Sequence, residues 1–241
     1  MTLQVLSSAK ILPMQRRPTP ELLDTDSGTP KEISDSLSDL RWFNRWFGGI
    51  ATSRKLLSRV TRQTGKTEFS WLEVAGGDGF VPNTLRKEFE RSGIRLRITL
   101  LDRAFSHLPK NGTMPKIAAD ALSLPFRDSA FDLVSCSLFV HHLSPEQATE
   151  FFREALRVCR VAFLVNDLIR HPLHLALAYA GAPLYRSRIT RNDAPASVWQ
   201  AYTIPEMRRI LHLAAAASVE AQQHYLFRMG VIAWKQEPKA A

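Results

Sequence analysis

The stretch WLEVAGGDG, residues 71–79, decides the fold of this chain of 241 residues. The apolar run from Phe69 to Ala75 predicts a short buried strand, and the glycines that follow it predict a tight turn. Pro82 favours the start of a helix, because its missing N–H costs nothing in a first turn. Glycines permit positive φ and let a ligand approach the backbone closely. A strand, a glycine turn and a helix in this order indicate a ligand site at the edge of an α/β sheet.

Strands and helices alternate on the C-terminal side of this turn. Strands are predicted at 94–101, 116–119, 131–139 and 161–166, and helices at 145–158 and 203–213, the helices following the capping residues Ser144 and Thr203. The ranges 219–227 and 229–235 have no helix between them and predict a hairpin. We therefore expect an α/β, Rossmann-like doubly wound fold with a mainly parallel seven-stranded sheet, an antiparallel C-terminal hairpin and an N-terminal helical extension.

The N-terminal part of the chain has a different pattern. Within residues 21–60 an apolar face recurs at intervals of three and four, formed by Leu37, Leu40, Phe43, Trp46 and Phe47. Gly48-Gly49 predicts a break before a second helix at 50–60. We expect three regions: a disordered tail at 1–20, a helical cap at 21–62 and a Rossmann-like domain at 63–241.

Composition narrows the class of protein. Hydrophobic residues make up 45% of the chain, and the formal net charge is +9. The best apolar candidate for a membrane span, Leu173 to Leu184, is too short and is broken by Gly181 and Pro183. Cys136 and Cys159 form no CxxC pair and lie in apolar surroundings, which predicts buried free thiols. With no secretory signal visible, we expect a cytoplasmic protein without a membrane span.

The glycine turn also narrows the class of cofactor. A dinucleotide usually needs the spacing G-x-G-x-x-G, and here Gly77 and Gly79 are followed by Pro82 at the third position. Proline does not allow the close packing of helix on strand that a third glycine allows, so a nicotinamide or flavin dinucleotide is disfavoured. A sulfonium nucleoside that carries an amino acid has no phosphate, and an acid at Glu73 suits its ammonium group.

The same residues resemble a known family. EVAGGDG at 73–79 is similar to the first motif of class I S-adenosylmethionine-dependent methyltransferases, with Ala75 where a glycine is usual; this departure costs little if the φ of Ala75 is negative. LLDR at 100–103, AD at 119–120 and FDLVSC at 131–136 resemble the later motifs in family order. HHL at 141–143 resembles small-molecule methyltransferases of the ubiquinone/menaquinone-biosynthesis type.

The resemblance implies S-adenosyl-L-methionine as the cofactor. Asp102 is then placed to accept hydrogen bonds from ribose hydroxyls, and Asp120 to hold the adenine amino group. No metal site is expected. The full set of expected cofactor-binding residues is Glu73, Ala75, Gly76, Gly77, Gly79, Asp102, Arg103, Asp120, Ala121 and Ser137.

The expected reaction is in-line displacement of the sulfonium methyl by a nucleophile on the acceptor. His142 and His141 are the candidate bases, because the imidazole of histidine can take up a proton near neutral pH. An aromatic lid from Trp42, Phe43, Trp46 and Phe47 and a wall from residues 179–199 favour a small aromatic or apolar acceptor, phenolic or lipid-like.

Two other functions stay open at this stage. The basic charge and Arg186, Arg188 and Arg191 allow a nucleic-acid methyltransferase, although no Asn/Asp-Pro-Pro-aromatic tetrapeptide follows the fourth strand. A non-catalytic binding module with this fold is the second alternative, disfavoured by the intact acids Glu73, Asp102 and Asp120. The sequence gives no indication of the acceptor's identity, of O-, N- or C-methylation, or of oligomeric state.

Overall fold

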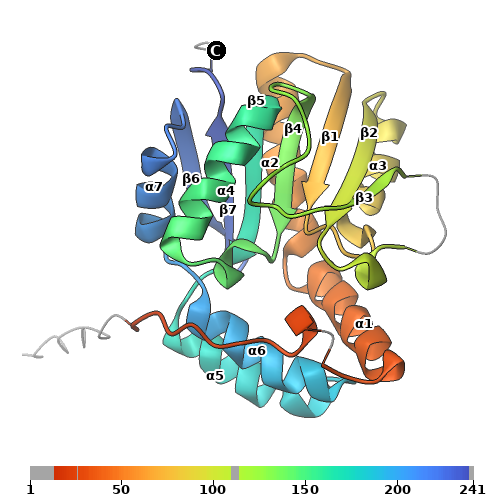
Figure 1. The fold of residues 1–241 in the computed structure, drawn as a ribbon, viewed down its shortest axis with the longest axis vertical. Helices are drawn as coiled ribbons and strands as arrows, with labels where there is room; N and C mark the ends of the chain where they lie inside the picture. Colours follow the sequence, from red (N-terminus) through yellow and green to blue (C-terminus); the bar gives the residue numbers. More distant parts are fainter. Residues whose placement is uncertain (1–13, 26, 110–113, 239–241) are drawn as a thin grey trace, which may run out of the picture.

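A computed structural model describes residues 14–25, 27–109 and 114–238. Within these residues seven strands form one sheet in the order β3-β2-β1-β4-β5-β7-β6 (Figure 1). Strands β1 to β5 run parallel, and β7 runs antiparallel to both β5 and β6, so the predicted α/β sheet with its C-terminal hairpin is confirmed. The strands span Glu68–Val74, Arg95–Asp102, Lys116–Ala118, Phe131–Ser137, Cys159–Leu168, Ser218–His224 and Arg228–Trp234.

Helices cover both faces of the sheet. Helices α2 (Gly49–Thr64) and α3 (Phe80–Arg91) pack on one face, and α4 (Pro145–Val158) and α7 (Ile204–Leu213) pack on the other. Each face buries its own apolar cluster. Ser144 and Thr203 cap α4 and α7 through reciprocal bonds with the third helical residue, as their sequences predict. Cys136 and Cys159 are buried and free.

Three further helices form a separate layer beyond the carboxyl ends of the parallel strands: α1 (Pro30–Trp46), α5 (Pro172–Ala180) and α6 (Arg188–Gln200) (Figure 1). The sequence pattern did not predict α5 or α6. Helix α5 is apolar on nearly every side, so it has no periodic stripe, and α6 contains Pro195 and buries polar residues as well as apolar ones. The expected N-terminal helical extension is present.

The N-terminal region has the two helices that the pattern predicts, α1 and α2, but the first begins later than residue 21. Helix α1 begins only at Pro30, where Thr29 and Glu32 form a capping box. Before it lie an extended segment and a short 3-10 helix, η1 (Leu23–Thr25). Residues 14–20 of the expected tail are bound to the protein, and the rest of that tail lies outside the described residues. We call residues 14–25 the N-terminal strap.

Arginine side chains hold the strap in place. Arg16 donates from Nε to the carbonyl of Gln200 at 2.6 Å and from Nη2 to the carbonyls of His141 and Leu143 at 2.9 and 2.8 Å. Arg17 places its guanidinium 4.5 Å from the ring centre of Trp199. The strap therefore crosses from α6 to the segment that follows β4.

Candidate functional site

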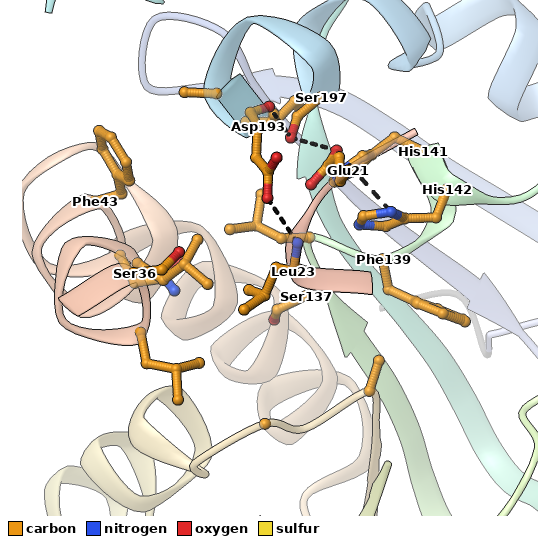
Figure 2. Close-up of a pocket in the computed structure, with 18 of the residues that line it drawn as sticks. Glu21, Leu23, Ser36, Phe43, Ser137, Phe139, His141, His142, Asp193 and Ser197 are labelled. Carbon is orange, nitrogen blue, oxygen red and sulfur yellow. Dashed lines mark hydrogen bonds and ion pairs between the residues drawn. The ribbon is translucent and has the colours of Figure 1, made fainter. Parts of the chain in front are cut away.

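A cavity of about 920 Å³ lies between the carboxyl ends of the strands and the layer of α1, α5 and α6. This volume is near the upper end of the roughly 300–1,000 Å³ that ligand pockets usually have. The order of the sheet reverses between β1 and β4, which is where an open α/β sheet places its ligand. Figure 2 shows that the strap, α1, α6 and the segment after β4 converge on this cavity.

The glycine turn forms the floor of the cavity. Gly76 donates its N–H to the carbonyl of Leu101 at 3.0 Å, and Gly77 donates to Asp102 Oδ2 at 3.0 Å. Gly77 has a φ of 48°, and a side chain there would point into open space, so its backbone faces the cavity. Gly79, at φ 70°, does not line the cavity and instead caps α3. Pro82 stands third in that helix, not first.

Ala75 departs from expectation. Its φ is 52°, not the negative value that would make alanine a costless replacement for glycine. A left-handed conformation costs a residue with a β-carbon about 1–2 kcal/mol. The turn holds this strain beside the cavity, where strained residues are concentrated in proteins.

The three carboxylates that the sequence singled out all face this one cavity: Glu73, Asp102 and Asp120. Asp102 is buried; besides its bond from Gly77, it accepts from the N–H of Ala104 at 2.9 Å. Asp120 is exposed and accepts from the N–H of Leu122 at 2.9 Å. Of the other expected cofactor residues, those that line the cavity are Ala75, Gly76, Gly77, Arg103, Ala121 and Ser137.

Glu73 lies at the buried end of the cavity. Its carboxylate takes hydrogen bonds from Ser135, Ser137 and Trp71. Burial raises the pKa of Glu73 to about 7, although these hydrogen bonds act in the opposite direction. The carboxyl group of Glu73 therefore ionises near neutral pH, and a nearby cation would favour its charged form.

His141 is buried beside a second carboxylate. Its Nδ1 lies 2.6 Å from Asp167 Oδ1, and its backbone N–H donates to Asp167 Oδ2 at 3.1 Å. Burial by itself would lower the pKa of His141, but the charges and hydrogen bonds of Asp167 and Glu21 raise it to about 10. At neutral pH His141 is thus a cation that already holds its protons.

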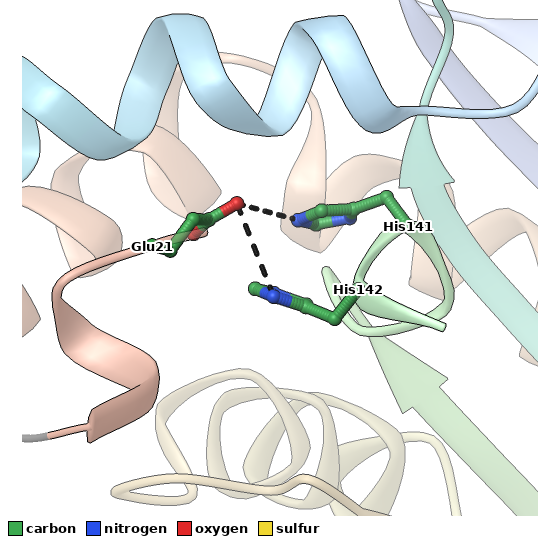
Figure 3. Close-up of side chains that lie close together, drawn as sticks. All are labelled: Glu21, His141 and His142. Carbon is green, nitrogen blue, oxygen red and sulfur yellow. Dashed lines mark ion pairs between the residues drawn. The ribbon is translucent and has the colours of Figure 1, made fainter. Parts of the chain in front are cut away.

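His142 lies next to His141 and is partly open to solvent. Its Nδ1 is 3.0 Å from Asp24 Oδ2 and 3.9 Å from Glu21 Oε1. Figure 3 shows the Glu21 carboxylate between the two imidazoles, 3.5 Å from His141 Nε2. Both histidines line the cavity, so the structure brings the predicted pair to the predicted cofactor residues.

The strap supplies functional groups that the sequence did not reveal. Glu21 is buried and accepts from Ser197 Oγ at 2.6 Å and Gln200 Nε2 at 2.7 Å. Asp193 of α6 accepts the N–H groups of Leu22 and Leu23 at 2.9 and 3.0 Å. These partners are more than a hundred residues apart in the chain, and no motif connects them, so sequence patterns offered no signal for this contact.

The histidine pair and the strap also form a cluster of metal-ligand type. One atom each from Glu21, His141 and His142 lies within 4.8 Å of the others. The ion pairs just described account for this spacing, because two imidazoles share one buried carboxylate. The expectation of no metal site stays a prediction.

The apolar face of α1 lines the cavity and is not part of the core. Trp42, Phe43 and Phe47 pack on one another, with ring centres 4.9 to 5.9 Å apart, and all three line the cavity. Trp46 does not line it and is largely exposed. The apolar face predicted from the sequence was therefore wrong to include Trp46 and to omit Trp42. The expected second wall is present as residues of η4 (Ala182–Leu184) and α6.

Comparison with known proteins gives one family match. Residues 72–162 match the family described as "Methyltransferase domain". A search of curated proteins found no match for the sequence.

Several solved structures are similar to the fold. The plantazolicin methyltransferase BpumL, in complex with a monoazolic desmethylPZN analog and SAH, superimposes with a TM-score of 0.69 at 13% identity over 90% of this chain and 95% of that one. The plantazolicin methyltransferase BamL, with a triazolic analog and SAH, gives 0.62 at 12% identity over 89% and 98%. A SAM-dependent methyltransferase from Methanosarcina mazei gives 0.50 at 17% identity over 71% and 94%. The fold is thus that of S-adenosylmethionine-dependent methyltransferases.

The residues of the cavity fit that cofactor. A bare glycine backbone at Gly77 leaves room for a ligand, since a side chain there would meet nothing within 4 Å. Glu73 offers a carboxylate partner for an ammonium group. Asp102 ends β2 and Asp120 follows the end of the neighbouring strand β3, and both line the cavity in which a nucleoside would lie. The described residues show no helix that is long and apolar enough to cross a membrane.

Proposed function

We propose that this chain, which has the methyltransferase fold and matches the methyltransferase domain over residues 72–162, is an S-adenosylmethionine-dependent methyltransferase acting on a small aromatic or apolar acceptor. One observation carries the proposal. The glycine turn, the carboxylates Glu73, Asp102 and Asp120, and the pair His141 and His142 all line a single cavity of sufficient volume. The nearby aromatic side chains of α1 favour a phenol- or quinol-like acceptor, in line with the resemblance to ubiquinone/menaquinone-type enzymes.

The chain's own residues have a limited task in such a reaction. When bound, S-adenosylmethionine supplies a methyl group that its positive sulfur has already activated. Glu73 would neutralise the ammonium end of the cofactor, Asp102 would hold the ribose, and the backbone at Gly77 would allow the cofactor to approach closely. The side chains of α1 and the strap would exclude water from the part of the cavity that they line. They would also align the acceptor for in-line attack.

The two histidines have separate roles in this proposal. The pKa of His141 is raised to about 10, so at neutral pH His141 keeps its positive charge and anchors Glu21 of the strap. His142 is the residue placed to take a proton from an acceptor hydroxyl, with Asp24 at 3.0 Å to stabilise the imidazolium that forms. His142 would accept the hydroxyl proton of the acceptor, while the bound cofactor would supply the methyl group; its methyl–sulfur bond would break as the acceptor oxygen bonds to the methyl carbon, with S-adenosylhomocysteine as the leaving group.

Two measurements test the proposed function. Calorimetry should detect binding of S-adenosylhomocysteine, and a tritiated-methyl screen over phenols, quinols, fatty acids and RNA should label a phenolic or quinol-like acceptor. Labelling of RNA alone would replace the proposal with a nucleic-acid methyltransferase. Binding of the cofactor product without transfer to any acceptor class would favour a non-catalytic module.

Replacing His142 with alanine should lower turnover by about 100-fold or more when cofactor is saturating, because general-base catalysis contributes typically about 10²–10⁴-fold. The affinity for S-adenosylhomocysteine should change little, since His142 is not among the residues expected to hold the cofactor. Turnover should be restored in part at higher pH, where the acceptor ionises by itself. An unchanged turnover would dismiss His142 as the base.

Binding of S-adenosylhomocysteine should tighten as the pH rises from about 6 to 8. The pKa of Glu73 is raised to about 7, so the carboxyl is protonated at the lower pH and charged at the higher one, where it attracts the ammonium group. In calorimetric titrations below pH 7, binding should release a proton from Glu73. The measured binding enthalpy should therefore depend on the ionisation enthalpy of the buffer. Glu73→Gln should abolish this pH dependence; a variant that keeps the wild-type profile would show that another group is responsible.

A further inference from the structure

One segment of the layer beyond the strands is largely apolar. Residues 171–185, HPLHLALAYAGAPLY, contain no Lys, Arg, Asp or Glu, and they form α5 and η4. Four of their large side chains are exposed: Leu173 by 55%, Leu177 by 48%, Tyr179 by 58% and Leu184 by 70%. We call these four residues the α5 patch. A helix that is apolar on all sides is normally buried in a core or placed against lipid.

The α5 patch adjoins the mouth of the acceptor cavity. Leu177 and Leu184 are exposed and also line the cavity, whereas Leu173 and Tyr179 are exposed and do not line it. The turn between β6 and β7 extends the apolar surface, because Phe227 stacks on His171 and His174 at 5.0 and 4.9 Å. Tyr225 and Leu226 of that turn are likewise both exposed and cavity-lining. The same surface therefore forms an outer apolar face and the rim of the cavity.

The residues beside the patch are basic. The chain from 171 to 192 contains three arginines and no acidic residue, and the arginines at 186, 188 and 191 are exposed. Arg191 donates to the carbonyls of Ala182 and Tyr185, which fixes it next to η4. Arg188 is paired with Glu32, whereas Arg186 and Arg191 form no ion pair with the residues that the structure describes. With a net charge of +9, this edge complements an anionic surface.

We propose that the α5 patch inserts into the surface of an anionic lipid bilayer, with Arg186 and Arg191 among the headgroups. No described helix can span the bilayer, so the contact is peripheral. A lipid surface explains both features of the patch: exposed side chains that are apolar apart from the hydroxyl of Tyr179, and continuity with the cavity. A bilayer-soluble acceptor passes between Leu177 and Leu184 into the cavity without crossing water. Only this last step depends on the proposed function.

The test uses vesicle flotation of the full chain. Vesicles of equal parts phosphatidylcholine and phosphatidylglycerol should carry the protein upward, whereas vesicles of phosphatidylcholine alone should carry much less. Leu173→Glu combined with Tyr179→Glu should lower the partition coefficient by at least about tenfold, because it places two charges in the inserted face. These two side chains are exposed and do not line the cavity, so folding and S-adenosylhomocysteine affinity should be unchanged.

The matched control is Leu213→Glu at the end of α7, a leucine that is 61% exposed and lies outside the patch. This variant should float as the wild type does. Equal flotation of the double variant and the wild type would overturn the proposal. So would an absence of flotation together with a concentration-dependent oligomer that the double variant abolishes, since the patch would then join two copies of the chain. Because flotation needs neither cofactor nor acceptor, its failure is distinguishable from a failure of methyl transfer.

Discussion

Asp102→Ala should weaken the binding of S-adenosylhomocysteine by roughly a hundredfold, equivalent to about 2.7 kcal/mol. The carboxylate accepts the N–H of Gly77 at 3.0 Å and that of Ala104 at 2.9 Å, so it fixes the glycine turn to the end of β2. Its place in the cavity fits bonds to the ribose hydroxyls as well. Hydrogen bonds to a charged group contribute about 1.5–3 kcal/mol each, so losing both the ribose contacts and the ordered turn gives this loss.

Calorimetry measures this effect, and Asp128→Ala is the control. Asp128 is an exposed carboxylate that pairs with Arg157 at 2.9 Å and does not line the cavity. Its replacement should leave the affinity unchanged. If Asp102→Ala bound S-adenosylhomocysteine as tightly as the wild type, the cavity would not hold the nucleoside in the proposed place.

Asp167→Ala should lower the free energy of unfolding by about 3–5 kcal/mol. Asp167 is buried and accepts from His141 Nδ1 at 2.6 Å and from the N–H of Leu168 at 2.7 Å. Its removal leaves the buried imidazolium of His141 without its principal counter-charge, while Glu21 stays 3.5 Å away. Urea unfolding followed by circular dichroism measures the loss.

A double variant separates the charge from the packing. His141→Phe combined with Asp167→Leu removes both charges, so it should recover part of the stability that Asp167→Ala loses. A double variant that is less stable than Asp167→Ala would mean that packing, and not the uncompensated charge, dominates at this position.

The same ion pair should make stability depend on pH in two directions. The pKa of His141 is raised from 6.5 to about 10, so its stabilising effect is complete below pH 6.5 and is lost as the pH rises toward 10. Burial opposes ionisation of Asp167, but the charge of His141 lowers its pKa below 3.8, so that contribution is lost as the pH falls below this value. Stability from the pair should therefore be greatest between about pH 4 and 6.5.

The structural features that the sequence predicts correctly share one property: each depends on residues close together in the chain. The capping boxes at Ser144 and Thr203, the apolar runs of the central strands and the glycine turn all belong to this class. A parallel sheet then places the ends of neighbouring strands at one edge, which is why Glu73, Asp102 and Asp120 share a cavity. Helix α5 was missed because an apolar helix has no stripe to detect.

By itself, the sequence determined the Rossmann-like sheet, the strand ends that line the cavity and the pairing of His141 with His142 in one loop, because short-range spacing and hydrophobic periodicity specify these. Tertiary structure alone decided that Glu21 and Asp24 of the strap contact the histidines and that Asp167 stabilises the protonated form of His141. It also decided that Ala75 has a positive φ and that leucines of α5 are exposed to solvent. The contacts of the histidines join segments that are far apart in the chain. They depend on three-dimensional packing and on electrostatics in a buried site, which no local pattern encodes.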